Sequence, residues 1–332
     1  MTRIDRLPAI ARGLHATSAL PEALTGAPFV PTVLGSAHGY RCEAYARSLA
    51  AVGSPLFLTR ADGWLLDRPV PNSRAHDLSG CYPLLACGDW AGLESDLRAL
   101  PNDFASIVGV ADPLADVSPA LLQQCFPDLM RPFKDHMIAN LSQPFESYVS
   151  SQHQRKARRS LLSIEVEASE EPWNWTADWL SLYSNLVDRH SISGVANFSE
   201  KSLVAQLRVP GALGFRALND GETIGMLVFY LSGPNSYYHL GAHSETGYGL
   251  GSSFALFWRA LEWMQTKGVE RVDLGGGAGL AVSENDGLAR FKRGWANEIR
   301  PAYLCGRIIN PELYHQLSKG KRGNFFPTYR SV

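Results

Sequence analysis

Two segments in the last third of the chain carry residue types that could do chemistry. The first, residues 247–253, reads Gly-Tyr-Gly-Leu-Gly-Ser-Ser, and we expect it to be a loop that opens a helix over residues 253–267. Glycines let a backbone approach a ligand closely, and the free amides of a first helical turn bind anions such as a pyrophosphate. A tight turn with a serine cap would explain the same residues without a ligand. A Walker loop is excluded because no Gly-Lys-Ser/Thr follows, and a Rossmann loop is disfavoured because the preceding strands look like a hairpin.

The second segment follows a predicted strand over residues 269–274. Three glycines, residues 275–277, come directly after this strand, and ligands often bind at the carboxyl end of a parallel strand. Further along the chain, residues 290–293 read Arg-Phe-Lys-Arg. We therefore expect Lys292 to reach the reaction centre or a phosphate, and a solvated basic helix face is the alternative.

The elements expected around these segments form one unit. Strands are predicted over residues 214–218, 223–231 and 236–242, a helix over 253–267, a strand over 269–274, a short helix over 287–295 and a last strand over 299–304. Asn219-Asp220-Gly221 is a hairpin turn signal between the first two strands. This order predicts an α+β fold whose mixed sheet contains one parallel crossover. Residues 84–111 repeat part of the order faintly, so we expect two related halves, residues 1–145 and residues 146–332.

Composition excludes several classes of protein. Among 332 residues, Lys and Arg nearly balance Asp and Glu, giving a formal net charge of −1, which argues against a protein that coats nucleic acid. A hydrophobic fraction of 45% rules out global disorder. Five cysteines at irregular spacing predict neither a disulfide framework nor a metal site. We expect a cytoplasmic protein without stable membrane insertion, because no long apolar run occurs and residues 1–12 lack the pattern of a secretory signal.

Four short stretches together resemble a known superfamily. They are Tyr-Tyr-His-Leu-Gly-Ala at 237–242, Gly-Leu-Gly-Ser at 249–252, Val-Asp-Leu-Gly-Gly at 272–276 and Leu-Ala-Arg-Phe-Lys-Arg-Gly-Trp at 288–295. With the basic run Gln-Arg-Lys-Ala-Arg-Arg at 154–159, they make residues 135–305 resemble a GNAT-superfamily acyltransferase of the Fem-type branch, which includes the peptidoglycan interpeptide-bridge aminoacyltransferases. This resemblance implies two tandem GNAT-like folds, each a mixed, mostly antiparallel sheet flanked by helices, of which the first is degenerate.

The resemblance also implies where a donor would bind. GNAT enzymes hold the pyrophosphate of coenzyme A on the backbone amides of a glycine loop, and Gly249 and Gly251 match its glycines. The Arg or Gln that usually begins this pattern is Thr246 here, which weakens the match to coenzyme A. The residues expected to bind the donor are Gly249, Leu250, Gly251, Ser252 and Ser253.

Acyl transfer to an amine needs a proton acceptor and stabilisation of a tetrahedral oxyanion. The amides of the strand over 236–242 are expected to bind the donor carbonyl. His239, His243, Glu245 or Asp273 could accept the proton. Lys292 matches the functional lysine of Fem enzymes, and Tyr238 lies in the strand that supplies their active-site tyrosine, although neighbouring Tyr237 fits as well. The catalytic candidates are Lys292, Tyr238, His239 and Asp273.

These features predict an N-acyltransferase that moves an acyl group from acyl-CoA to an amine on a small molecule or a precursor. One alternative is Fem-like transfer of an amino acid from aminoacyl-tRNA to an amine of a cell-envelope precursor or small metabolite. Another is a non-catalytic GNAT-like binding subunit. The basic residues of 155–159 are the only dense positive cluster for an RNA. Since acyl-CoA is the preferred donor, we expect reversal of their charge to change donor binding by less than about threefold. The acceptor, the acyl group and the oligomeric state stay open.

Overall fold

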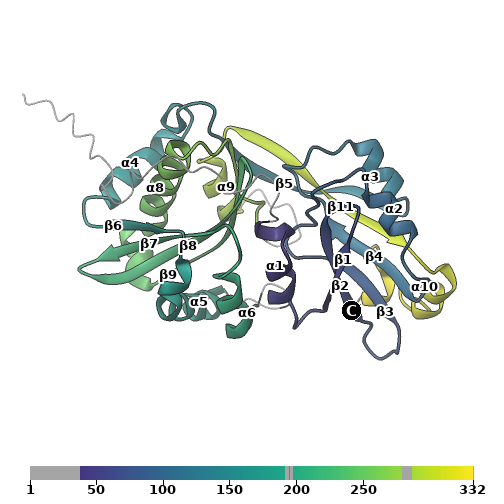
Figure 1. The fold of residues 1–332 in the computed structure, drawn as a ribbon. Helices are drawn as coiled ribbons and strands as arrows, with labels where there is room; N and C mark the ends of the chain where they lie inside the picture. The colour runs from purple at the N-terminus through teal and green to yellow at the C-terminus, as the bar shows by residue number, and fades with distance from the viewer. Residues whose placement is uncertain (1–37, 191–193, 195–196, 279–285, 332) are drawn as a thin grey trace, which may run out of the picture.

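A computed structural model describes residues 38–190, 194, 197–278 and 286–331. Figure 1 shows two halves that lie side by side and share one continuous sheet. The sheet has eleven strands in the order β1-β2-β3-β4-β11-β5-β10-β9-β8-β7-β6. Residues 1–37, which include those on which the expectation about a secretory signal depends, lie outside the described part of the chain.

The first half supplies five strands and three short α-helices. They are α1 (Glu43–Ser48), β1 (Ser54–Leu58), β2 (Gly63–Pro69), β3 (His76–Gly80), α2 (Leu93–Arg98), β4 (Phe104–Val110), α3 (Pro119–Cys125) and β5 (Leu129–Asn140). A 3-10 turn, Gly39–Arg41, precedes α1. Alternation along β2 and β4 separates two faces: Leu65 and Ile107 are buried among residues of α2 and α3, whereas Leu66 is buried with residues of α1.

The second half contains the longer strands and helices. They are α4 (Ser151–Ser160), β6 (Glu165–Ser169), α5 (Thr176–His190), α6 (Glu200–Gln206), β7 (Ala212–Asn219), β8 (Glu222–Ser232), β9 (Asn235–His243), α7 (Glu245–Leu250), α8 (Ser252–Thr266), β10 (Arg271–Asp273), α9 (Gly287–Arg293), β11 (Glu298–Ile308) and α10 (Pro311–Leu317). The hairpin turn is confirmed, since Asp220 and Gly221 have φ of 51° and 82° between β7 and β8. Gly268, with φ of 78°, ends α8 as its sequence pattern suggests.

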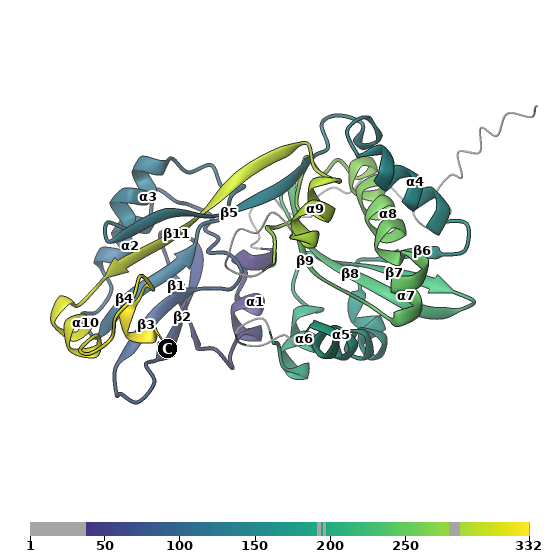
Figure 2. The same cartoon turned by 180° about the vertical axis from the view of Figure 1, so that it is seen from behind.

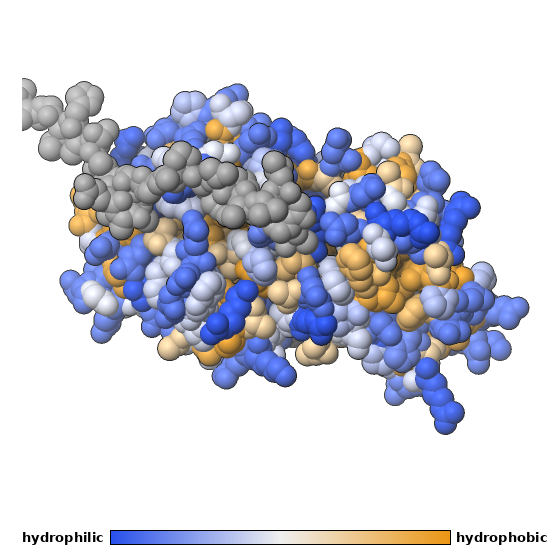
Figure 3. Space-filling view, in the orientation of Figure 1, coloured by the Kyte–Doolittle hydropathy of each residue, from blue (hydrophilic) through white to orange (hydrophobic). Residues whose placement is uncertain are grey.

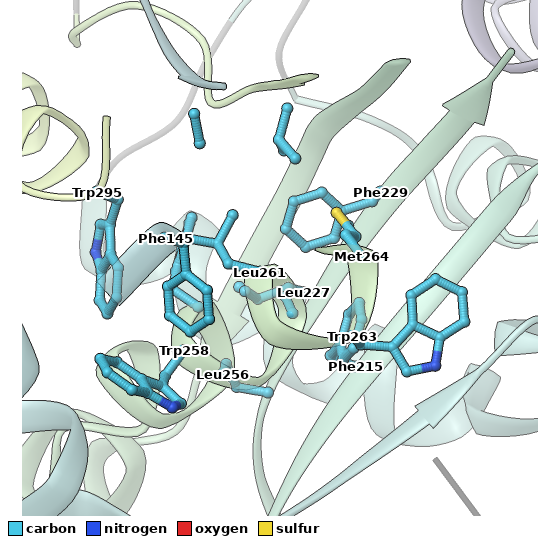
Figure 4. Close-up of a cluster of buried hydrophobic side chains, with 14 of the residues drawn as sticks. Phe145, Phe215, Leu227, Phe229, Leu256, Trp258, Leu261, Trp263, Met264 and Trp295 are labelled. Carbon is cyan, nitrogen blue, oxygen red and sulfur yellow. The ribbon is translucent and has the colours of Figure 1, made fainter. Parts of the chain in front are cut away.

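Two helical layers enclose the strands of the second half. Figures 1 and 2 show α4 and α8 on one face of β7–β9 and α5 and α6 on the other. The α8 face buries a large cluster that includes Phe215, Phe229, Trp263 and Trp295 (Figure 4). The α5 face buries Trp179 together with residues of α1 from the first half. The β9 backbone is therefore held rigidly from both sides, which is what a precise site requires.

The two halves exchange strands. β11 pairs antiparallel with β4 and along nearly the whole of β5, so the last strand completes the sheet of the first half. In return, the end of β5 pairs with β10 of the second half, from Ile138 to Asn140. The strand expected over 299–304 is present within β11, but the expectation that it closes the second unit is wrong, because it pairs with β4 and β5. The α+β class and the mixed sheet are confirmed, and the division at residues 145 and 146 stays a prediction.

Candidate active site

Strands β9 and β10 separate in the middle of the sheet. They pair in parallel only from Asn235 with Arg271 to Tyr237 with Asp273. Beyond this point β10 ends and turns into Gly275–Gly277, whereas β9 continues to His243 beside β8. One edge of β9 from Tyr238 onward therefore has no pairing with β10. Of the residues 236–242 expected to bind a donor carbonyl, Ser236 and Tyr237 are paired with β10, and the open edge begins at Tyr238.

A bulge in β9 lies at the start of this opening. Tyr238 pairs with Phe229 and Leu240 pairs with Val228, so His239 is an extra residue between them. Bulges re-aim side chains and increase local twist, and they are common next to active sites. On one side of β9, Tyr238 packs against Phe229 and Phe257. Tyr237 and His239 face the opposite layer, around Tyr40.

Lys292 is buried at the carboxyl end of β10, as its position in the sequence pattern suggests. Only 7% of the residue is exposed, and its Nζ donates to the Gly276 carbonyl oxygen at 2.8 Å. The ammonium also lies 5.5 Å from the ring centroid of Tyr238. Burial lowers the pKa of Lys292 to about 8, while the Asp273 carboxylate opposes this shift. The alternative of a solvated basic face is therefore wrong for Lys292.

Asp273 forms a buried dyad with a histidine from the other half. His136 Nδ1 lies 2.8 Å and 3.0 Å from the two carboxylate oxygens of Asp273. Asp273 Oδ1 also accepts a hydrogen bond from Gly275 N at 2.7 Å, which fixes the turn below Lys292. A carboxylate that holds a histidine in one orientation is a common arrangement for proton transfer. The dyad exists because β5 crosses into the second half.

Tyr237 of β9 and Asp112 form a second polar pair. Tyr237 Oη donates to Asp112 Oδ2 at 2.7 Å. Burial raises the pKa of Asp112 to about 6, although the bond from Tyr237 works against the shift. Asp112 and Tyr237 also line a cavity of about 840 Å³ between the halves. The sequence analysis did not single out His136 or Asp112 as site residues.

His239 and His243 occupy positions typical of structural histidines. His239 Nδ1 lies 3.1 Å from Tyr40 Oη, and Nε2 lies 3.1 Å from Gln206 Oε1. Burial lowers the pKa of His239 to about 3 and that of His243 to about 4. His243 Nδ1 pairs with Ser252 Oγ at 2.8 Å beneath the start of α8. The Lys292 ammonium lies over Tyr238. Asp273 is paired in register with Tyr237 and acts on Asp112, so it lies on the face of the sheet that also carries His239.

The glycine-rich segment is a short helix rather than the predicted open loop. Ser244 caps α7 by accepting a hydrogen bond from Gly247 N at 3.1 Å. A serine at this position stabilises a helix enough to offset the glycines within it. The helix ends at Leu250, and Gly251 adopts the left-handed conformation with φ of 73°. Helix α8 then begins with no side-chain cap, which leaves its first turn suited to an anion.

The basic helix α4 packs against this turn. Ser160 Oγ donates to the Leu250 carbonyl oxygen at 2.8 Å, and Lys156 Nζ lies 4.8 Å from the ring centroid of Phe254. The exposed cations of α4 are Arg155, Lys156, Arg158 and Arg159. Lys156 therefore lies beside the first turn of α8, and the other three cations are exposed on the same helix. This contact changes the expectation that reversing them leaves donor binding nearly unchanged.

Substitution of Gly251 by valine is expected to weaken donor binding much more than folding. The strain of a side chain at positive φ costs about 1–2 kcal/mol, and a Cβ there would lie 2.9 Å from Ser160 Oγ. The added bulk would occupy the junction of α4 with α8. Calorimetric titration with an acyl-CoA measures the affinity, and thermal denaturation measures the stability.

Gly268→Val is the matched control, because Gly268 has a φ of 78° at the far end of α8 and open space around it. The control should lose similar stability and keep its donor affinity. Equal donor affinity in Gly251→Val and the wild type would contradict a donor site at this turn.

Among the described residues, no group of three or more His, Cys, Asp or Glu side chains is arranged to hold a metal ion. No helix of the same residues is long and apolar enough to cross a bilayer.

Comparison with known proteins gives a domain match and several fold matches. Residues 150–293 match the family model of the acetyltransferase (GNAT) domain. The crystal structure of FemX matches with a TM-score of 0.63 and 14% identity over 89% of this chain and 96% of that one. L-PGS from Bacillus licheniformis matches with a TM-score of 0.52 and 16% identity over 82% and 88%.

A further fold match is the C-terminal domain of a putative lysylphosphatidylglycerol synthetase from Agrobacterium fabrum. Its TM-score is 0.54 at 14% identity, over 82% of this chain and 89% of that one. At these identities the likeness is one of fold. No curated protein sequence matches the chain significantly.

Proposed function

We propose that this chain, whose residues 150–293 match the acetyltransferase (GNAT) domain model, is an acyltransferase that moves an acyl group from acyl-CoA to an amine. The observation that carries the proposal is the separation of β9 from β10 at Tyr237 and Asp273, directly beside the buried ammonium of Lys292. An open strand edge supplies amide donors, and a buried cation stabilises developing negative charge.

The donor phosphates are assigned to the turn between α7 and α8. Amides of the first turn of α8 attract anions, and the cations of α4, of which Lys156 lies beside this turn, add positive charge. His243 and Ser252 hold each other at 2.8 Å under this turn and so fix its position. From here a pantetheine arm would follow the open edge of β9 toward Tyr238.

The acceptor is assigned to the cavity between the halves. Asp112 and Tyr237 lie on its wall, and it contains two further carboxylates, Asp89 and Asp116, as well as the cations Arg41 and Lys267. A cavity of about 840 Å³ with three carboxylates suits an acceptor that carries a protonated amine. Asp112, with its pKa raised to about 6, is charged at neutral pH and can bind that ammonium.

In the transfer step the bound ammonium first gives one proton to the His136–Asp273 dyad, and the neutral amine then attacks the thioester carbonyl, forming the C–N bond. The carbonyl oxygen becomes an oxyanion that β9 amides and the Lys292 ammonium stabilise. The C–S bond then breaks, and the thiolate leaves as coenzyme A after it takes up the second proton that the amine nitrogen loses. Tyr238, packed over the Lys292 ammonium, positions that cation.

One observation favours an alternative donor. The exposed cations of α4 would also bind the acceptor end of a tRNA, and the Fem-type fold of FemX extends over 89% of this chain. Aminoacyl transfer to a precursor amine is therefore the second candidate. A binding subunit without activity is the third, and the buried Lys292 argues against it.

The donor test compares a panel of acyl-CoAs with charged tRNAs, by calorimetry at two salt concentrations and by an amine-acylation assay. Acyl-CoA is expected to bind with a shallow salt dependence, because it presents few phosphates, and to support turnover. Reversing Arg155, Lys156, Arg158 and Arg159 to glutamate should weaken acyl-CoA binding by about tenfold or more.

Reversal of the exposed Lys319 and Arg322 serves as the control and should leave donor affinity unchanged. If acyl-CoAs fail to bind, while a charged tRNA binds with a steep salt dependence that the α4 variant abolishes, the aminoacyl-tRNA alternative replaces the proposal. If neither acyl-CoA nor a charged tRNA supports transfer, a non-catalytic binding subunit replaces both enzymatic proposals.

A further inference from the structure

A separate cavity of about 460 Å³ lies in the first half, on the sheet face opposite α2 and α3. Its floor consists of residues of β4, β5 and β11, and Leu49 and Val52, which follow α1, lie on one wall. These floor residues are Val108, Val110, Phe133 and Leu304. None of them takes part in the acyl-transfer site. On the face drawn in Figure 3, apolar side chains gather over this half of the molecule.

The C-terminal segment forms the opposite wall. Phe325, Phe326 and Pro327 line the cavity, and Phe325 is 51% exposed. The ring of Phe326 covers Gly306 of β11 so closely that a Cβ there would lie 2.4 Å from it. Only glycine therefore allows this segment to lie against the sheet beside an open apolar groove.

One end of the groove is charged. Asp77, fully buried, accepts hydrogen bonds from Arg330 Nε at 2.6 Å and from Arg68 Nε at 3.0 Å. Tyr329 Oη donates to the same carboxylate at 2.9 Å. Two guanidinium groups therefore share a single carboxylate, and both arginines line the cavity.

This end has one positive charge in excess. Arg68 Nη2 lies 3.0 Å from Asp77 Oδ1, yet it is a buried nitrogen that makes no hydrogen bond to the described residues. A third arginine, Arg131, lies exposed at the rim of the other end of the groove, since Leu304 pairs with both Arg131 and Val110. A buried donor without a partner costs free energy, and an anion placed beside Arg68 would recover it.

We propose that this cavity binds a single-chain amphiphile with a carboxylate head. The head pairs with Arg68 and Arg330, and the chain lies along β4 between the segment that carries Leu49 and Val52 and the segment that carries Phe325 and Phe326. From Ser106, beside the charged end, to Val110 the strand spans four steps, or roughly 13 Å. That length suits a medium-length acyl chain.

The proposal is tested by calorimetry on the full chain with sodium decanoate. Decanoate is expected to bind at one site, at least about tenfold more tightly than butyrate, which lacks the chain, and decyltrimethylammonium, which reverses the charge. Equal binding of decanoate and decyltrimethylammonium, or binding at many equivalent sites, would overturn the proposal by showing nonspecific adsorption.

Two variants locate the site. Arg68→Gln removes the excess cation while Asp77 keeps Arg330 and Tyr329, and Val108→Trp fills the groove; each should weaken decanoate binding by about tenfold or more. Leu162→Ser, at an 87% exposed position in the second half, is the control and should bind as the wild type does. Unchanged affinity in Arg68→Gln contradicts the proposal, whether or not Val108→Trp folds.

Discussion

Replacing Lys292 by methionine is expected to lower turnover by about 10²–10³-fold while the protein stays folded. Methionine keeps the apolar stem that packs near Tyr238 and removes the ammonium that donates to Gly276. The loss should appear in kcat rather than in donor affinity, because the charge develops in the transition state. Steady-state kinetics with a saturating acyl-CoA measures it.

The pH dependence provides an internal check. The pKa of Lys292 is lowered to about 8 from 10.5, so the wild-type rate should fall as pH rises through about 8 and the ammonium loses its proton. Between pH 8 and 10.5, Lys292 binds more protons in the unfolded chain than in the folded one. The contribution of Lys292 to the free energy of unfolding therefore increases as pH rises across that window. Lys292→Met should lack both effects.

Two outcomes would contradict this role. Unchanged kcat and KM in Lys292→Met would make the lysine a packing residue, despite its burial. A melting temperature that falls by tens of degrees would indicate that the ammonium mainly stabilises the fold. Donor affinity within about twofold of the wild type is the expected companion result.

Patterns among residues that lie close together in the sequence predicted much of the secondary structure of the second half. The turn at Asp220-Gly221 and the helix that ends before Gly268 depend on residues a few positions apart, and both are present. In both cases neighbouring residues determine the backbone. Burial of Lys292 depends instead on its contact with Gly276, 16 positions away.

The parts that escaped prediction depend on distant contacts. His136 meets Asp273 across 137 positions, and Tyr237 meets Asp112 across 125, so no local spacing reveals either pair. The same is true of the strand exchange between β5 and β11, which brings His136 to the site. Periodicity also cannot show that Ser244 turns a glycine-rich loop into a helix.

Removal of the imidazole in His136→Gln is expected to lower kcat by about 10²–10³-fold, with little change in KM for the donor. Glutamine keeps a polar contact with Asp273 and removes the group that accepts the amine proton. The loss of kcat in His136→Gln should become smaller as pH rises, because a larger fraction of the acceptor amine is then neutral without proton transfer to His136. A pH-rate profile of wild type and variant measures this difference.

His239→Gln tests the competing assignment of the proton acceptor. His239 is bonded at both ring nitrogens and lies on the face of β9 away from Lys292, so its replacement should reduce stability more than kcat. Asp273→Asn should resemble His136→Gln, since it leaves the imidazole without the carboxylate that orients it. If His239→Gln loses about 10²-fold or more in kcat while His136→Gln remains active, His239 is the proton acceptor. The His136–Asp273 pair would then only stabilise the crossing of β5 into the second half.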